Sequence, residues 1–164
     1  MPPVAKSSVE RVRAALLAAG HADSIAEFPE GTRSAADAAA AIGCEVAQIA
    51  KSIVFRAVTE HGERVALAIA SGVNRVSVAK MQAALGVTLK RADGDWVRER
   101  TGFAIGGVAP LAHLTPPLLV FDRDLLALHP IWAAAGSPRH VFATEAAELA
   151  RITGAVVADI REDG

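Results

Sequence analysis

The sequence predicts an α+β fold, in which helices pack around a mixed β-sheet. Helical and strand-like segments are interspersed without the strict strand–helix alternation of a doubly wound parallel sheet. Segment 65–70 is strand-sized and almost continuously apolar, which indicates a strand covered on both faces. A length of 164 residues with 52% hydrophobic and 21% charged residues fits one globular domain, which we expect to span residues 1–164.

Helix signals recur along the chain. Ser7 and Glu10 have the spacing of a capping box, apolar residues then recur at helical spacing, and Gly20 is a natural stop. Segment 34–43 is rich in alanine, which costs least in a helix and permits close packing against a sheet. Further helices are predicted at 45–50 as a short turn, at 78–85 after a Ser77 cap, at 95–100, and up to Arg151 after a Thr144 cap.

Strand signals are clearest in the middle of the chain. Segment 52–58 is β-branched and apolar, and 60–63 has the glycine of a hairpin turn that leads to an antiparallel partner over 64–70. Two glycine-containing loops are predicted at 101–110 and 134–138. Other extended segments are predicted at 25–28, near Leu89, and at 118–121, 139–143 and 155–160.

Composition excludes several classes of protein. A formal net charge of −1 argues against a bulk binder of DNA or another polyanion, but it is compatible with a local pocket for a few phosphates. Cys44 is the sole cysteine, so we expect no intrachain disulfide and no cysteine-rich zinc site, which fits a reducing cytoplasm. No secretory signal is evident, and no segment approaches the ~20 apolar residues of a membrane helix. We therefore expect a cytoplasmic protein without membrane segment, metal or cofactor.

Three segments could carry chemistry, and each has a plainer alternative. Lys51 is flanked by apolar residues at a predicted helix-to-strand junction, where it either points into a cleft or extends to solvent. Backbone N–H groups of Gly106–Pro110 could hold a carbonyl or oxyanion, or the segment is only a tight turn. Thr32 and Arg33, before helix 34–43, could seat a phosphate or serve in ordinary capping. The glycine loop matches neither a dinucleotide-binding nor a Walker motif.

Taken in order, four blocks of the sequence resemble the YbaK/EbsC family, the bacterial aminoacyl-tRNA deacylases related to the inserted editing domain of prolyl-tRNA synthetase. The resemblance spans roughly residues 25–160. Any one block is weakly specific, whereas all of them in the same order are a strong signal. The blocks are GTRSAADAA at 31–39, QIAKSIVF at 48–55, TGFAIGGVAP at 101–110, and Ala135-Gly136.

The resemblance implies a mixed, partly barrel-like sheet surrounded by helices, with no metal and no serine or cysteine nucleophile. It implies that Lys51 binds and orients the terminal adenosine of tRNA, that backbone N–H groups of the Gly106–Pro110 loop hold the aminoacyl carbonyl, and that Gly136 shapes the opposite wall. The residues that it assigns to catalysis are Lys51, Gly106, Gly107, Val108, Ala109 and Pro110. The residues that we expect to bind substrate are Phe28, Thr32, Arg33, Ser52, Ala135, Gly136 and Ser137.

The expected activity is deacylation of mischarged aminoacyl-tRNA, most consistently tRNA(Pro) carrying alanine, cysteine, serine or 2-aminobutyrate. The expected partners are the RNA acceptor end and prolyl-tRNA synthetase, which would present the substrate. Phe28 lacks a hydroxyl, and segment 137–141 does not resemble the Cys-tRNA deacylase branch, so the amino acid stays open. Candidate phosphate contacts are Lys51, Arg33, Lys80 and Arg139.

Two other functions fit the same residues. One is a non-catalytic module that binds tRNA or a nucleotide, although an oxyanion-holding loop has less use in such a protein. The other is a hydrolase of a small aminoacyl ester that is not attached to tRNA. Comparable activity on a free aminoacyl-adenosine and on tRNA would favour the latter.

Overall fold

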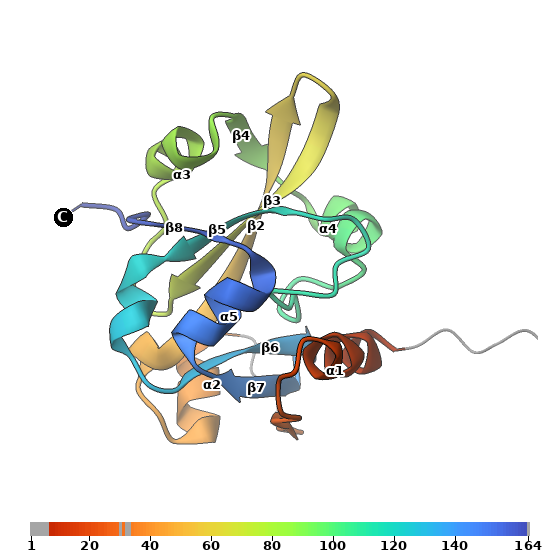
Figure 1. Cartoon of the computed structure of the whole chain (residues 1–164), viewed down its shortest axis with the longest axis vertical. Helices are drawn as coiled ribbons and strands as arrows, with labels where there is room; N and C mark the ends of the chain where they lie inside the picture. Colours follow the sequence, from red (N-terminus) through yellow and green to blue (C-terminus); the bar gives the residue numbers. More distant parts are fainter. Residues whose placement is uncertain (1–6, 30, 32–33, 164) are drawn as a thin grey trace, which may run out of the picture.

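The computed structural model describes residues 7–29, 31 and 34–163. Within them, eight strands form one sheet in the order β1-β7-β6-β2-β3-β5-β8, and β4 pairs with β2 beside this path (Figure 1). The β2–β6, β3–β5 and β5–β8 pairs are parallel, and the other pairs are antiparallel. The strands are β1 (Ile25–Glu27), β2 (Ile49–Thr59), β3 (Gly62–Ser71), β4 (Thr88–Arg91), β5 (Leu118–Asp122), β6 (Ile131–Ser137), β7 (His140–Thr144) and β8 (Val156–Ala158).

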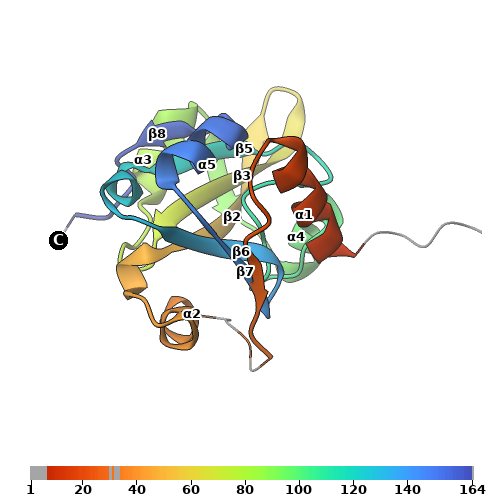
Figure 2. The same cartoon turned by 60° about the horizontal axis from the view of Figure 1, so that its bottom comes forward.

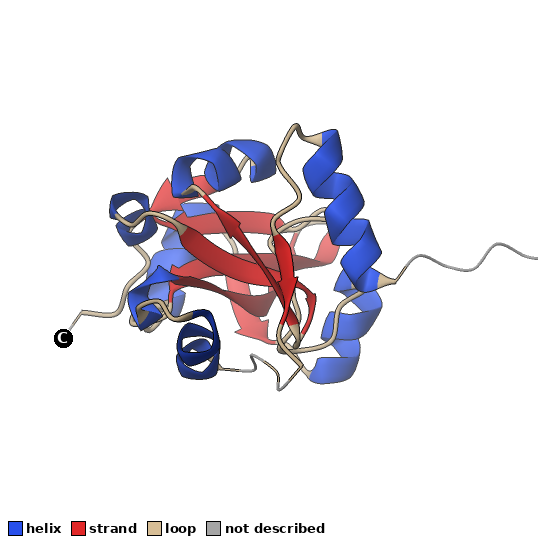
Figure 3. Ribbon diagram, turned by 90° about the horizontal axis from the view of Figure 1, so that it is seen from below, coloured by secondary structure: helices blue, strands red, loops and turns tan. Residues whose placement is uncertain are grey.

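Helices surround this curled, mixed sheet, as the sequence predicted (Figure 3). Helix α1 packs along β6, and α2 lies apart from it near the start of β2 (Figure 2). The helices are α1 (Ser8–Ala18), α2 (Ala35–Ile42), α3 (Val78–Leu85), α4 (Gly94–Thr101) and α5 (Ala146–Thr153), with 3-10 turns η1 (Val46–Gln48) and η2 (Arg123–Ala127).

Strand β3 is covered on both faces, which confirms the prediction from its apolar sequence. Every residue from Val65 to Ser71 is buried. Leu67 and Ile69 belong to a cluster with residues of α1, α5 and the segment after α4. Ala66, Ala68 and Ala70, which alternate with them, belong to a second cluster with α3. Successive residues of a strand point to opposite faces of the sheet. Each residue of the neighbouring strand β2 therefore lies on the same face as the β3 residue with which it pairs.

Helix starts follow the polar caps in the sequence, with one exception. The Ser7 hydroxyl accepts from the Glu10 N–H at 3.2 Å, and Ser34 and Ser77 cap α2 and α3 in the same way. The predicted Thr144 cap is wrong, because Glu145 precedes α5 and its side chain makes no capping bond. The Thr144 hydroxyl instead bonds Nε2 of the buried His21 at 2.9 Å.

Two local predictions differ from the structure around β6 and β2. The loop predicted at 134–138 is wrong in large part, because residues up to Ser137 belong to β6 and only the next two residues turn. Its alanines have low β-propensity, so the pairing of β6 with β2 and β7 overrides local preference. Lys51 does not lie at a helix-to-strand junction but is the third residue of β2.

Candidate functional site

A pocket opens where one edge of strand β2, the edge opposite β3, has no paired strand. Strand β6 pairs with β2 only through Ile49 and Ala50, and β4 begins to pair with β2 at Phe55. The pocket, of about 90 Å³, lies at this break beside α2, and we call it the edge pocket. At roughly 30 Å³ per water molecule, it has room for a few waters or one small side chain.

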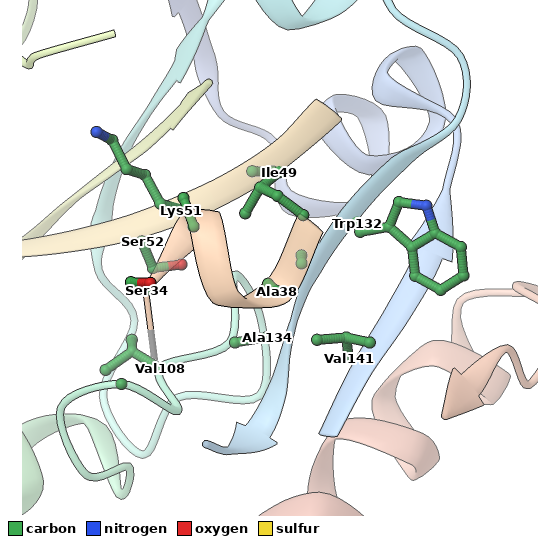
Figure 4. Close-up of a pocket in the computed structure, with 13 residues that line it drawn as sticks. Ser34, Ala38, Ile49, Lys51, Ser52, Val108, Trp132, Ala134 and Val141 are labelled. Atoms are coloured by element: carbon green, nitrogen blue, oxygen red, sulfur yellow. The ribbon is translucent and has the colours of Figure 1, made fainter. Parts of the chain in front are cut away.

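Four of the predicted site residues line the edge pocket: Lys51, Ser52, Gly106 and Val108 (Figure 4). They come from β2 and from the segment Gly106–Pro110, which we call the glycine-rich loop and which is far from β2 in the sequence. Most of the other wall was not predicted from the sequence. That wall is made of small or apolar groups on α2, β6 and β7, chiefly Ala35, Ala38, Trp132, Ala134 and Val141, with Ser34 at the start of α2.

The remaining predicted residues do not line the pocket. Gly107, Ala109, Pro110, Ala135 and Gly136 are buried behind its wall. Ser137 packs directly against the glycine-rich loop, and Phe28 follows β1, where its N–H donates to the carbonyl of Arg139. Thr32 and Arg33 lie outside the described residues.

Two of the candidate phosphate contacts have other surroundings. The ammonium of Lys80 forms ion pairs with Asp159 at 3.0 Å and Asp163 at 3.1 Å and donates to the carbonyl of Arg161. It is therefore committed to the C-terminal segment. Arg139 is exposed in the turn between β6 and β7 and does not line the edge pocket.

Lys51 brings an uncommitted positive charge to the pocket. Its side chain leaves β2 away from Val108 and Ala134, with the ammonium at the far end (Figure 4). Among the described residues this ammonium has no hydrogen-bond or ion-pair partner. Burial lowers the pKa of Lys51 below that of an ordinary lysine, the charge of Arg75 lowers it further, and Asp122 partly opposes the shift. Such a cation suits an anionic group that comes from outside the protein.

Asp122 has a structural explanation of its own. Its carboxylate is buried and accepts from the Ser71 N–H at 3.0 Å, from the Asn74 amide at 2.8 Å and from the Asp124 N–H at 3.0 Å. These bonds join the end of β3 to the end of β5. The carboxylate is thus satisfied within the protein, while it remains close enough to act on the charge of Lys51.

Ser52 supplies a polar group on the opposite face of β2 from Lys51. Its Oγ is buried and has no hydrogen-bond partner among the described residues. An unpaired buried hydroxyl costs about 1–3 kcal/mol, so its presence calls for an explanation. The hydroxyl lies in the wall of a pocket that is otherwise mainly apolar, where a polar substrate group can satisfy it.

The glycine-rich loop approaches the backbone of β6 more closely than any side chain would permit. A Cβ on Gly107 would lie 2.6 Å from the Cα of Ser137, so only glycine fits. The Gly107 N–H itself donates to the Ala104 carbonyl at 3.0 Å. The N–H groups of Gly106 and Val108 have no acceptor among the described residues. Two donors next to the pocket are therefore open to a substrate carbonyl.

His113 holds the far side of this loop. Its Nε2 lies 2.6 Å from the Ala109 carbonyl, so Nε2 carries the proton, and the buried Nδ1 has no partner among the described residues. Burial lowers the pKa of His113, the bond to Ala109 partly offsets this, and the charge of Arg11 lowers it slightly more. The imidazole is a structural support and does not line the edge pocket.

Helix α1 ties both walls together from behind. The Ser8 hydroxyl donates to the Gly136 carbonyl at 2.6 Å. The Arg11 guanidinium lies over the Phe103 ring at 4.8 Å and donates to the carbonyls of Gly102 and Ala112, both at 3.4 Å. One helix therefore fixes β6 and the glycine-rich loop relative to each other.

A family model matches most of the chain. The chain matches the model of the aminoacyl-tRNA editing domain over residues 29–152. A solved structure of a candidate trans-editing enzyme for prolyl-tRNA synthetase is 43% identical with a TM-score of 0.87, covering 98% of this chain and 100% of that one. Another, from epitope backbone grafting onto scaffold proteins, is 41% identical with a TM-score of 0.87, covering 97% of this chain and 100% of that one. The uncharacterized protein YwhH of Bacillus subtilis is 28% identical over 130 residues, which is 79% of this chain and 81% of YwhH.

The matched region contains every element that lines the edge pocket. Strand β2, the glycine-rich loop, β6 and β7 all fall within residues 29–152, whereas α1 precedes them. Within the described part of the chain, no helix is long and apolar enough to cross a membrane. With the family model covering most of the chain and its pocket, this protein belongs to the aminoacyl-tRNA editing family and is an aminoacyl-tRNA deacylase.

Proposed function

We propose that this protein acts in trans on mischarged tRNA(Pro), from which it removes a small amino acid. The observation that carries the proposal is the edge pocket: a space of about 90 Å³, walled by alanines and valines, beside two open backbone donors and an uncommitted lysine. The similarity to a candidate trans-editing enzyme for prolyl-tRNA synthetase supports the choice of tRNA. Residues 1–164 would act as one editing domain.

The proposed chemistry relies on positioning and not on a strong base. The ester carbonyl points at the N–H groups of Gly106 and Val108, which stabilise negative charge as water attacks the carbonyl carbon. Loss of one such donor typically costs on the order of 10²–10³ in rate. The tRNA's own free terminal hydroxyl helps to orient the water. The bond between the acyl carbon and the ribose oxygen then breaks, and the proton that the water loses passes to this oxygen, which leaves as a hydroxyl group.

Two side chains on opposite faces of β2 hold the substrate. Lys51 contacts the phosphate or ribose of the terminal nucleotide, where its free ammonium meets an anion. The buried hydroxyl of Ser52 accepts a hydrogen bond from the α-ammonium group that every aminoacyl ester carries. The two contacts fix both ends of the ester bond relative to the loop.

Pocket size supplies the selectivity. A synthetase separates amino acids that differ by one methylene by only about 1–3 kcal/mol, so small residues enter a proline site. The edge pocket is small enough for the side chain of alanine, cysteine, serine or 2-aminobutyrate. Larger side chains at position 38 or 134 would narrow the pocket further, so Ala38 and Ala134 are the positions that set its size limit.

The proposed partner and the proposed compartment are inferred from charge and composition. A net charge of −1 predicts weak intrinsic affinity for tRNA, so we propose that prolyl-tRNA synthetase presents the substrate. The single cysteine, Cys44, is free, which suits the reducing cytoplasm in which we place this activity.

The test is to charge tRNA(Pro) separately with alanine, cysteine, serine, 2-aminobutyrate and proline, and to follow release by the protein and by Lys51→Ala. Fast release of one small amino acid, with proline spared and Lys51→Ala slow, is the expected result. If no ester is cleaved above its spontaneous rate, the proposal fails and a binding module is the better description. Equal activity on a free aminoacyl-adenosine would point instead to a general small-ester hydrolase.

A further inference from the structure

The free edge of β2 continues beyond the edge pocket. The N–H of Gly72 donates to the Ile49 carbonyl at 2.7 Å, so the backbone groups of Ile49 point toward β3. Backbone direction alternates along a strand, and the N–H and C=O groups of Ser52 and Val54 therefore point away from β3. In the described residues nothing pairs with the N–H and C=O groups of Ser52 there, because β6 has already ended its pairing and β4 has not yet begun.

A second hollow lies along this stretch. Its volume is about 350 Å³, and its floor is apolar, made by Ile53, Val54 and Phe55 of β2 with Val78 and Leu89. The rim carries Lys90 and Arg91 of β4, which are exposed and form no ion pair among the described residues. No acidic side chain lines it. We call this hollow the β4 groove.

The β4 groove and the edge pocket are continuous along the chain. The edge pocket ends with Lys51 and Ser52, and the β4 groove begins with Ile53. Lys51, Ile53 and Phe55 occupy the same face of β2, and Arg91 lies directly opposite Phe55 in the antiparallel register. At about 3.3 Å per residue, the path from Lys51 to Phe55 is about 13 Å, which spans a few stacked bases at ~3.4 Å each.

We propose that the β4 groove holds the single-stranded nucleotides that precede the terminal adenosine of the tRNA. This inference rests on the proposed function, since it extends the substrate from the edge pocket. Proteins that bind single strands combine cationic groups for the backbone with apolar and aromatic surfaces for the bases. The groove offers this combination: Phe55 faces the bases and Arg91 meets a phosphate, at the far end of a strip that starts with Lys51.

The first experiment measures binding directly. The probes are an RNA hairpin with a single-stranded acceptor end and the same hairpin with a blunt end, each labelled for fluorescence anisotropy. Wild-type protein should prefer the hairpin with the single-stranded end. Arg91→Glu should weaken that preference about tenfold, Arg91→Lys should largely restore it, and Phe55→Leu should weaken it about fivefold.

The matched control is Arg151→Glu, which makes the same change in net charge. Arg151 is exposed on α5, which packs against the other face of the sheet. Among the described residues its one ion pair is with Glu148, at 3.9 Å. This variant should bind both hairpins as the wild type does. If Arg151→Glu and Arg91→Glu lose the preference for the single-stranded end equally, only overall charge matters and the groove proposal is wrong.

The second experiment separates the groove from the chemistry. Arg91→Glu should raise KM about tenfold for aminoacyl-tRNA with kcat unchanged, and it should hydrolyse an aminoacyl-adenosine, which lacks the preceding nucleotides, as the wild type does. Equal slowing on both substrates would overturn the groove proposal. If the wild type hydrolyses neither substrate, the proposed function fails, while the hairpin measurement still decides whether the groove binds RNA.

Discussion

The Ser8 hydroxyl donates a hydrogen bond of 2.6 Å to the Gly136 carbonyl, and this contact joins the first turn of α1 to the irregular end of β6. The approach is close: a Cβ on Gly136 would lie 2.7 Å from the Ser8 carbonyl oxygen. Helix α1 precedes the region that matches the editing-domain model, yet it supports a wall of the edge pocket. The contact therefore couples an outlying helix to the site.

Gly136→Ala should lower the free energy of unfolding by about 2 kcal/mol or more. The backbone there has φ of +100°, a strained conformation for alanine, and the added Cβ also meets Ser8. Chemical denaturation measures the change. Gly62→Ala is the control, because φ there is +102° but nothing lies within 4 Å, so it shows strain alone. Equal losses in the two variants would mean that the contact with α1 adds nothing.

Gly107→Ala should slow deacylation by on the order of 10²–10³, because the new Cβ pushes the loop off Ser137 and displaces the donors of Gly106 and Val108. Single-turnover rates on the best aminoacyl-tRNA measure this. In Gly94→Ala the new Cβ would meet only Ile105 at 3.7 Å, and activity should stay near that of the wild type. A fully active Gly107→Ala would remove the loop from the mechanism.

Local signals predicted the fold class and the β2–β3 hairpin well. The apolar run of β3 and the glycine of its turn are properties of neighbouring residues, so the sequence contains them directly. Strand β6 was missed because its Ala133, Ala134 and Ala135 have little strand preference and become a strand only by pairing with β2 and β7. Thr144 failed as a cap because its hydroxyl serves His21, which is distant in sequence.

The site was predictable only in part, for the same reason. Lys51 and the Gly106–Pro110 loop were candidates from the residues alone, but only the family resemblance chose between a role at the site and a plainer one. The structure brings Lys51, Ser52, Gly106 and Val108 to one pocket. The alanines of α2 and β6 that complete the wall carry no chemical signal in the sequence. Their place at the site depends on the break in pairing between β6 and β4 along β2, which is a property of the assembled sheet.

Lys51→Met should lower the deacylation rate about 10²-fold, and at neutral pH it should slightly raise the melting temperature. Burial lowers the pKa of Lys51, so the charged ammonium is less favourable in the folded state than in the unfolded one, and methionine removes that cost while it keeps the apolar stem. In the pH range between the lowered pKa and the ordinary one near 10.5, the unfolded chain binds more protons.

Wild-type stability from this group therefore rises with pH through that range, and the difference from Lys51→Met should shrink at alkaline pH. Melting curves of both proteins at neutral and alkaline pH measure the difference. Lys80→Met is the opposite control, because its ion pairs with Asp159 and Asp163 raise its pKa and its loss should destabilise the fold. A less stable Lys51→Met at neutral pH would contradict the assignment of Lys51 as a strained, functional cation.

His113 should make the protein sensitive to mild acid. Burial lowers the pKa of His113, so below about pH 6.5 the unfolded chain takes up a proton that the folded chain resists. Stability from this group is complete above pH 6.5 and is lost as the pH falls toward the lowered pKa, with a slope of at most ~1.4 kcal/mol per pH unit.

His113→Gln keeps an N–H donor for the Ala109 carbonyl but cannot titrate, and its unfolding free energy should fall less between pH 7.5 and 5.5. His61→Gln, in the exposed β2–β3 turn, should behave as the wild type does. If His113→Gln and the wild type lose stability equally over this range, the acid sensitivity arises elsewhere and the imidazole is not the neutral support of the loop that its hydrogen bond to Ala109 indicates.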